Sequence, residues 1–212
     1  MEQVKEKKQR MTLTDQLRIV FKGVTEPVAG FFNRLGLMPN TMTLLGLAGN
    51  VAGAILLSQG NMFWGGILIL VMGPVDALDG TMARLRGMAG SFGAFVDSVS
   101  DRYSELIIFG GLIYYYAQQN DMLSSIAVYA AAAGSVLVSY IRSRGQSLGW
   151  DTKVGILTRA ERYLVLAPAL ILGAVNSNIP LVGIWIIAVL ANVTAIQRII
   201  DVRRQARQDS LK

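Results

Sequence analysis

Six hydrophobic stretches, separated by short polar connections, constrain the fold of this chain more than any other feature. A helical membrane span needs about 20 predominantly apolar residues, and several stretches approach that length. Apolar residues make up 52% of the chain and charged residues only 16%, which is too apolar for an ordinary soluble domain. We therefore predict an all-α integral membrane protein in which six transmembrane helices form one catalytic membrane domain, residues 38–203. The stretches are residues 41–58, 62–83, 92–116, 122–141, 160–175 and 180–199.

Basic residues are confined to one set of connections. The connections 59–61, 117–121 and 176–178 contain no Lys or Arg, although the chain has 20 basic residues. By the positive-inside rule, both termini and the basic connections are cytoplasmic, so we predict a protein of the cytoplasmic membrane. The asymmetry accounts for the net charge of +6, and we predict no nucleic-acid partner.

The segment before the first stretch has two parts. Residues 1–12 are polar and basic, predict a tail, and lack the apolar core of a signal peptide. In residues 13–37, apolar residues recur at helical spacing with basic residues opposite, which predicts an amphipathic helix in the membrane interface. The alternative is a surface helix packed on the cytoplasmic side of the protein itself. Pro27 should kink or interrupt this helix, and residues 204–212 predict a basic C-terminal tail.

Two pairs of aspartates lie inside the hydrophobic stretches, Asp76 with Asp79 and Asp97 with Asp101. Ionisable groups at membrane depth are energetically expensive, so their presence indicates a function. Helical spacing places each pair on one face of its helix, and the basic, glycine-bearing segment between the pairs predicts a turn. An antiparallel hairpin would bring all four carboxylates to the same depth.

A cation must neutralise four carboxylates that share a site. The chain has no His and no Cys, and hard oxygen ligands alone suit Mg²⁺, Mn²⁺ or Ca²⁺. A pair of such ions, about 3.5 to 4 Å apart, is the usual arrangement for displacement at phosphorus. Arg84 and Arg102 are the alternative source of positive charge, in which case the acids would only hold helices together.

The aspartates belong to a longer motif. It reads Asp76-x-x-Asp79-Gly80-x-x-Ala83-Arg84, followed by Gly93-x-x-x-Asp97-x-x-x-Asp101. This motif resembles the full signature of the CDP-alcohol phosphatidyltransferase family, with no departure at a fixed position. The resemblance implies that the four aspartates bind two divalent cations, Mg²⁺ or Mn²⁺, and that Asp101 takes the proton from the attacking hydroxyl. It also implies a metal-dependent phosphotransferase, with a CDP-linked lipid as donor and CMP as leaving group, that forms a homodimer.

Small and basic residues near the aspartates are candidates for the nucleotide site. They are Gly80, Ala83, Arg84, Gly93, Asn40 and Thr43. The two glycines lie on the acid-bearing faces, where they would let a nucleotide approach the backbone, with close helix packing as the alternative. The resemblance favours the nucleotide role and extends it to the alanine and the arginine. Pro39-Asn40-x-x-Thr43 resembles a segment near the cytidine pocket of the family, although Asn40 is also expected to cap the first span.

Arginines near the cytoplasmic ends of the later spans are candidates to bind the acceptor. They are Arg142, Arg159, Arg162 and Arg198. Converging arginines beside a metal centre suit an anionic, phosphorylated acceptor, whereas contact with lipid headgroups is the alternative for each of them. Two segments around these arginines, SYIRSRGQSLGW and LTRAERYLVL, have sequences that resemble one branch of the family. This branch is the phosphatidylinositol phosphate synthases, which use CDP-diacylglycerol and inositol 1-phosphate.

We therefore predict an enzyme that transfers the phosphatidyl group of CDP-diacylglycerol to a phosphorylated polyol, with inositol 1-phosphate as the first candidate. Glycerol 3-phosphate is also anionic, so a phosphatidylglycerophosphate synthase is the alternative enzyme. A metal-ion transporter, in which carboxylates at membrane depth hold the cargo, is the alternative from another class. The glycines and the alanine of the motif have no evident use in a transporter.

Overall fold

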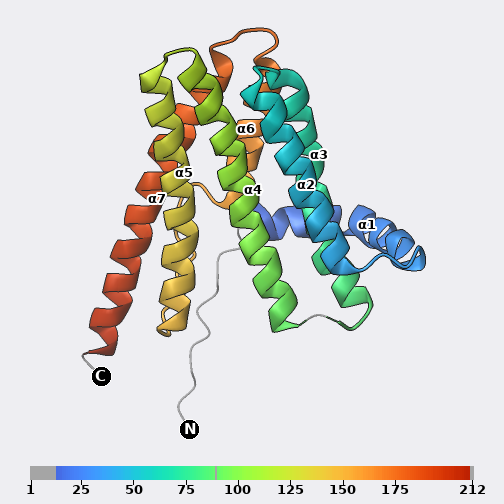
Figure 1. Ribbon diagram of the computed structural model, residues 1–212. Coiled ribbons are helices and arrows are strands. Elements are labelled where there is room, and N and C mark those ends of the chain that lie inside the picture. Colours follow the sequence, from blue (N-terminus) through green and yellow to red (C-terminus); the bar gives the residue numbers. More distant parts are fainter. Residues whose placement is uncertain (1–12, 89, 211–212) are drawn as a thin grey trace.

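The computed structural model describes residues 13–88 and 90–210, and this part of the chain is helical, without strands (Figure 1). The expected all-α class is confirmed. Residues 1–12, which we predicted as a basic tail, lie outside the described residues. The helices are α1 (Leu13–Arg34), α2 (Pro39–Ser58), α3 (Met62–Leu85), α4 (Ser91–Gln118), α5 (Met122–Ser147), α6 (Arg159–Leu172) and α7 (Ile179–Asp209).

Each hydrophobic stretch forms one helix, from α2 to α7. By length and composition, α2, α3, α5 and α7 can each cross a membrane. In contrast, α4 carries charged residues along its first half, and α6 has only 14 residues, about 21 Å at 1.5 Å per residue. Large apolar side chains such as Leu44 and Val71 are exposed on the outside of the bundle, as lipid contact requires. The protein is therefore an integral membrane protein.

The cap of α2 differs from our expectation. We expected Asn40 in the cap position, and this is wrong, because α2 begins at Pro39 and Met38 is the cap residue. Proline is favoured in the first turn, where its missing N–H would have no helical partner. The caps of α3 and α5 are polar: Asn61 and Asp121 accept hydrogen bonds from backbone N–H groups at 3.4 and 3.0 Å.

α7 extends beyond the stretch that predicted it. Because the helix ends at Asp209, the segment 204–212 that we predicted as a tail is helical as far as that residue. The indole N–H of Trp150 donates to Asp209 at 2.8 Å, and the amide of Gln205 donates to the carbonyl of Asp151 at 3.0 Å. These bonds hold the connection after α5 against the end of α7.

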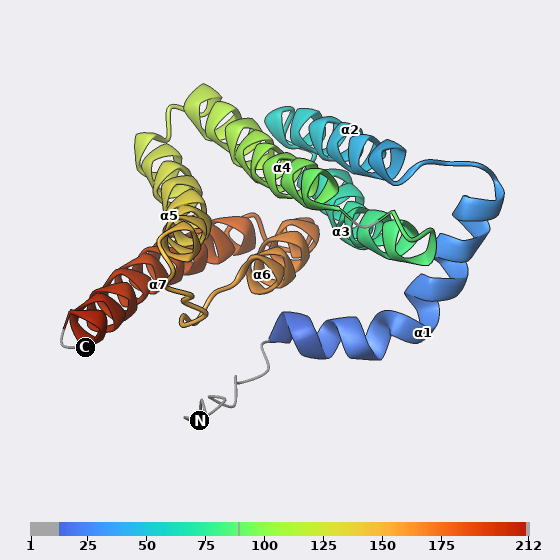
Figure 2. The ribbon, with the colours of Figure 1, turned by 90° about the horizontal axis from the view of Figure 1, so that it is seen from below.

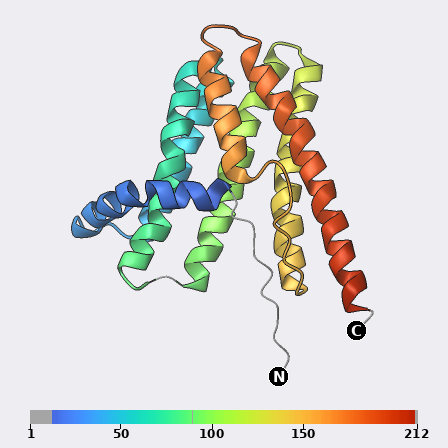
Figure 3. The same ribbon diagram turned by 180° about the vertical axis from the view of Figure 1, so that it is seen from behind.

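α1 runs crosswise to the other helices (Figures 1 and 3). The helix is continuous through Pro27, which we expected to kink or interrupt it, and it changes direction along its length (Figure 2). The amide of Asn33 donates to the carbonyl of Met82 at 3.3 Å, and Arg86 donates to the carbonyl of Asn33 at 3.0 Å. α1 is thereby attached to the end of α3.

Small residues allow α2 and α5 to lie close to neighbouring helices. A Cβ at Gly53 of α2 would lie 3.1 Å from Cγ1 of Ile69 in α3. A Cβ at Gly134 of α5 would lie 2.6 Å from the amide nitrogen of Asn192 in α7. That amide donates to the carbonyl of Ala130 at 3.0 Å, which adds a polar contact between the two helices.

The largest apolar core lies toward the end of the bundle that carries the connections without basic residues. Every helix from α2 to α7 contributes residues to this core. Leu57 and Tyr116 are its members near those connections. Its largest fully buried members include Phe109, Leu112, Leu170 and Ile187. The aspartates lie toward the opposite end of α3 and α4, so the polar site is separate from the centre of this core.

The two aspartate-bearing helices run antiparallel but share few close backbone contacts in the described part of the chain. Instead, α2 packs closely on both α3 and α4, and α6 packs on α3 (Figure 2). The predicted turn joins Leu85 to Ser91. Side chains from α3, α4 and α6 therefore meet where the backbones of α3 and α4 are not closely packed.

Candidate active site

The four aspartates gather from α3 and α4. Asp76 and Asp79 are each only 6% exposed, whereas Asp97 and Asp101 are partly exposed. Asp79 interacts electrostatically with Asp76 and Asp97, and Asp101 interacts with the same two residues. The structure thus brings together the two pairs that the hairpin was expected to place face to face.

Arg159, the first residue of α6, places its guanidinium between the two pairs. Nη2 lies 2.9 Å from Oδ2 of Asp76, and Nη1 pairs with Oδ1 of Asp101. The guanidinium also lies over the ring of Tyr163, 5.3 Å from its centroid. One cationic side chain therefore links carboxylates from α3 and α4.

The donor set fits divalent cations in type and charge. Four neighbouring carboxylates, in a chain with no His and no Cys, suit Mg²⁺ or Mn²⁺. No group of three acidic side chains among the described residues forms a closed metal-ligand cluster. The guanidinium of Arg159 is the cation between Asp76 and Asp101. Of the arginines that we considered as alternatives, Arg84 donates to the hydroxyl of Thr81 at 2.9 Å, and Arg102 donates to a backbone carbonyl.

α2 contacts both aspartates of α3. The hydroxyl of Thr43 donates to Oδ2 of Asp79 at 2.6 Å, and Oδ1 of Asp79 accepts from the N–H of Gly80. Gly46 lies against Asp76, where an added Cβ would come within 2.7 Å of Oδ1. Thr43 was predicted to lie near the nucleotide. The contacts of Thr43 and Gly46 with aspartates depend on how α2 lies against α3.

The glycines of the motif border open space. An added Cβ at Gly93 would meet no atom within 4 Å, and one at Gly80 would meet only the guanidinium of Arg84, at 3.5 Å. Ala83 is half-buried and Asn40 is exposed. Helix packing therefore does not require glycine at position 80 or 93, so the alternative explanation for these two residues does not apply.

Arginines of α5 and α7 lie near the beginning of α6. Arg142 and Arg162 are close enough to Arg198 to repel it electrostatically. Arg198 is buried and donates to two backbone carbonyls, at 2.6 and 3.0 Å. Arg142 is partly exposed, with its Nε 3.8 Å from Oδ1 of Asp151. The structure thus places these three predicted acceptor residues in one region.

Arg162 differs from the others because its side chain is only 2% exposed. Nε and Nη2 bind the two carboxylate oxygens of Glu105 at 2.6 and 3.0 Å, and Nη1 donates to the carbonyl of Leu157 at 3.3 Å. Glu105 was not among our predicted site residues. Its position four residues after Asp101, on the same face of α4, is the signal that would have revealed it.

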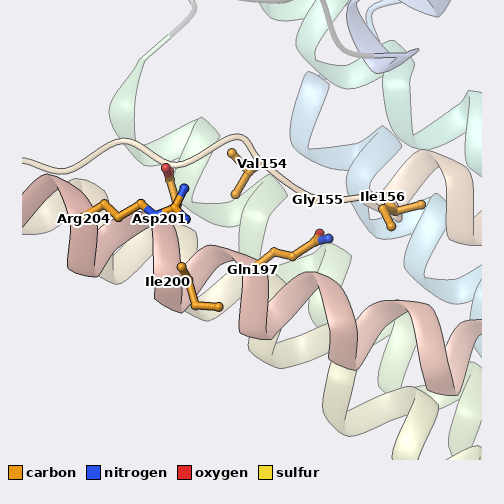
Figure 4. Close-up of a pocket in the computed structure, with 7 residues that line it drawn as sticks. All are labelled: Val154, Gly155, Ile156, Gln197, Ile200, Asp201 and Arg204. Carbon is orange, nitrogen blue, oxygen red and sulfur yellow. The ribbon is translucent and has the colours of Figure 1, made fainter.

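A separate pocket of about 440 Å³ lies between α7 and the connection that precedes α6 (Figure 4). It is lined by Val154, Gly155, Ile156, Gln197, Ile200, Asp201 and Arg204. None of the predicted site residues lines it, although Arg198 donates to the carbonyl of Val154. This pocket is therefore distinct from the aspartate cluster.

Several proteins with similar sequences are named phosphatidylinositol phosphate synthase. The family model for CDP-alcohol phosphatidyltransferase matches residues 36–196. Phosphatidylinositol phosphate synthase of Streptomyces avermitilis is 39% identical over 207 residues, which cover 92% of this chain and 84% of that protein. The protein of the same name from Mycobacteroides abscessus is 35% identical over 190 residues, which cover 88% and 86%.

Solved structures agree with these relatives. The crystal structure of Mycobacterium tuberculosis phosphatidylinositol phosphate synthase with CDP-DAG bound has a TM-score of 0.80 and 32% identity, and covers 84% of this chain and 93% of that chain. The structure of the same enzyme with manganese and citrate has a TM-score of 0.79 and 33% identity, and covers 84% and 88%. From the motif, the gathered aspartates and these matches, the chain belongs to the CDP-alcohol phosphatidyltransferase family.

Proposed function

We propose that this protein transfers the phosphatidyl group of CDP-diacylglycerol to a hydroxyl of inositol 1-phosphate, giving phosphatidylinositol phosphate and CMP. The observation that carries the proposal is the contact of Arg159 with Asp76 and Asp101, which places a phosphate-binding type of side chain within the aspartate cluster. The names of the relatives support this acceptor, and the bound CDP-DAG of the mycobacterial enzyme supports this donor.

Four aspartates are the proposed ligands of two divalent cations, Mg²⁺ or Mn²⁺. They are Asp76, Asp79, Asp97 and Asp101. The manganese complex of the mycobacterial relative supports this assignment. When bound, such cations neutralise negative charge that develops on the pyrophosphate as CMP leaves. Thr43 holds the carboxylate of Asp79 in place, and Gly46 leaves room for the carboxylate of Asp76, so that little reorganisation is needed during the reaction.

Asp101 is the proposed proton acceptor for the attacking hydroxyl. The chain has no histidine, and a partly exposed carboxylate is a suitable general base. Its contact with Arg159 places the base next to a residue that would bind the phosphate of the acceptor. One substrate carries both the hydroxyl and the phosphate, so these two residues together would orient it.

The remaining site residues form two proposed groups. For the nucleotide they are Gly80, Ala83, Arg84, Gly93, Asn40 and Thr43, and for the acceptor they are Arg142, Arg159 and Arg198. The open space at the two glycines supports the first group. The nearness of Arg142 to Arg198, and the contact of Arg159 with two of the aspartates, support the second. Arg162 was also predicted to bind the acceptor, but its buried guanidinium pairs with Glu105.

We further propose six spans, from α2 to α7, in one domain at residues 38–203, with α1 in the interface on the cytoplasmic side. The crosswise path of α1 and the exposed side chains of Val24 and Phe31 support the interfacial position. The basic residues near the aspartates support a cytoplasmic active site in the cytoplasmic membrane, with both termini on that side. A homodimer is proposed from the family resemblance alone.

Gly93→Ala is expected to weaken the binding of CDP-diacylglycerol without loss of the fold. The added methyl group meets no protein atom within 4 Å, so it would contact only a bound nucleotide. Overpacking of this kind costs about 1–3 kcal/mol, so we expect a KM for CDP-diacylglycerol about tenfold higher. The thermal unfolding temperature in detergent should be unchanged or slightly higher, because alanine favours a helix more than glycine does.

Gly110→Ala is the matched control for this experiment. Gly110 lies on the same helix, and an added Cβ there also meets nothing within 4 Å, but it is far along α4 from the aspartates. This variant should keep the wild-type KM for CDP-diacylglycerol. An unchanged KM in Gly93→Ala as well would contradict the nucleotide role of position 93.

An acceptor screen with product identification tests the proposed function. The purified protein is supplied with labelled CDP-diacylglycerol, a divalent cation and one of four acceptors: inositol 1-phosphate, glycerol 3-phosphate, inositol or serine. We expect phosphatidylinositol phosphate, with equal release of CMP, only from the first. Formation of phosphatidylglycerophosphate would identify the protein as a phosphatidylglycerophosphate synthase. A product from inositol or serine would contradict the proposal that the arginines bind a phosphorylated acceptor. Metal flux into proteoliposomes without CMP release would indicate a transporter.

A further inference from the structure

Two ion pairs, on successive turns, join α4 to α6. The outer pair is Asp101 with Arg159, and the inner pair is Glu105 with Arg162. Residues 101 and 105 are four apart on α4, and residues 159 and 162 are three apart on α6, so each helix presents its two charged groups on one face. The family motif contains Asp101 but neither member of the inner pair.

The inner pair is more buried and better bonded than the outer pair. Arg162 is 2% exposed and Glu105 6%, compared with 32% for Arg159 and 16% for Asp101. Both carboxylate oxygens of Glu105 accept from the planar guanidinium, an arrangement that fixes an arginine in orientation as well as in position. A guanidinium held in this way is not presented to a water-soluble acceptor.

The inner pair also holds the segment that leads into α6. Nη1 of Arg162 donates to the carbonyl of Leu157, two residues before the helix begins at Arg159. α6 packs closely on α3 and α7, but its backbone makes few close contacts with α4 in the described residues. The side chains of the inner pair therefore set where the beginning of α6 lies relative to α4.

We infer that Glu105 and Arg162 are positioning residues, which hold α6 so that the guanidinium of Arg159 lies between Asp76 and Asp101. Because a helix is rigid over three residues, fixing Arg162 against α4 also fixes the depth and rotation of Arg159. The inference rests on the proposed function, since it assigns to Arg159 the binding of the acceptor phosphate. It removes Arg162 from direct contact with that phosphate.

A double-mutant cycle separates positioning from direct binding of the acceptor. The variants are Glu105→Gln, Arg162→Met and the two combined, with Arg207→Gln as a control that removes an exposed arginine from the same side. If the inner pair positions Arg159, each single variant should lower kcat/KM for inositol 1-phosphate about tenfold or more. The double variant should be no worse than the worse single variant, because both changes break one contact. The KM for CDP-diacylglycerol should stay near the wild-type value.

Direct binding by Arg162 predicts a different result. In that case Glu105→Gln would leave the KM for the acceptor unchanged or lower, while Arg162→Met alone would raise it, and this outcome would overturn the inference. Thermal unfolding in detergent identifies variants that do not fold. If Glu105→Gln does not fold, Glu105→Asp takes its place, because it keeps the charge but shortens the side chain and should still raise the acceptor KM.

The distance between α4 and α6 tests the inference without a measurement of enzyme activity. The chain has no cysteine, so spin labels can be placed at Tyr103→Cys on α4 and Leu164→Cys on α6, where the native side chains are 59% and 49% exposed. Breaking the inner pair should shift or broaden the distribution of distances between the labels, whereas Arg207→Gln should not. An unchanged distribution in Arg162→Met would overturn the inference. Failure of the wild type to use inositol 1-phosphate would instead overturn the proposed function.

Discussion

Asp101→Asn is expected to lower the turnover number by about 10³-fold while the protein stays folded. The amide has the size of the carboxylate but cannot accept the proton of the attacking hydroxyl, and general-base catalysis typically contributes about 10²- to 10⁴-fold. Asp101 is also a proposed cation ligand, so the loss should exceed the lower end of that range. The release of CMP at saturating substrates and cation measures the effect, and thermal unfolding in detergent checks the fold.

Asp121→Asn is the matched control for the loss of an aspartate. Asp121 caps α5 at the opposite end of the bundle from the site, with its carboxylate bound to the N–H and hydroxyl of Ser124 at 3.0 and 2.5 Å. Asparagine caps helices about as well as aspartate, so both activity and stability should stay close to those of the wild type. Substantial turnover in Asp101→Asn would exclude Asp101 as the base.

Arg159→Ala is expected to raise the KM for the acceptor about 10- to 100-fold and to leave the affinity for CDP-diacylglycerol unchanged. A hydrogen bond to a charged group is worth about 1.5–3 kcal/mol, which corresponds to this change in KM. The same substitution leaves the carboxylates of Asp76 and Asp101 facing each other without the guanidinium between them. Steady-state kinetics with each substrate varied in turn measures the first effect.

The stability of the Arg159→Ala variant provides a second measurement. In a chelator, the variant should unfold at a lower temperature than the wild type, because two like charges have lost their common counter-ion. Adding Mg²⁺ or Mn²⁺ should reduce the difference, since divalent cations bind the same carboxylates. Arg159→Lys keeps the positive charge but lacks the planar guanidinium group. Its KM for the acceptor should lie between those of the wild type and Arg159→Ala. An equal loss of CDP-diacylglycerol affinity would contradict the assignment of this arginine to the acceptor.

The helices were predictable because their signals are local. The starts of α3 at Met62 and α5 at Met122 agree with the predicted stretches, since a run of apolar residues after a polar connection marks them. The N-terminus of α2 was misplaced by two residues, because proline favours the first helical position and asparagine favours the cap position, and the sequence does not rank the two. The end of α7 was placed too early, because apolar composition stops at the membrane boundary while the helix continues through charged residues.

The sequence by itself determined the helices, the membrane class and the aspartates that gather, because helical spacing fixes the face on which each side chain lies. The partners of those side chains were decided only by the tertiary structure. Thr43 binds Asp79 across 36 positions, and Arg159 reaches Asp76 across 83. Such contacts depend on the depth and rotation of each helix, which follow from the packing of the whole bundle. No periodicity within one helix contains that information.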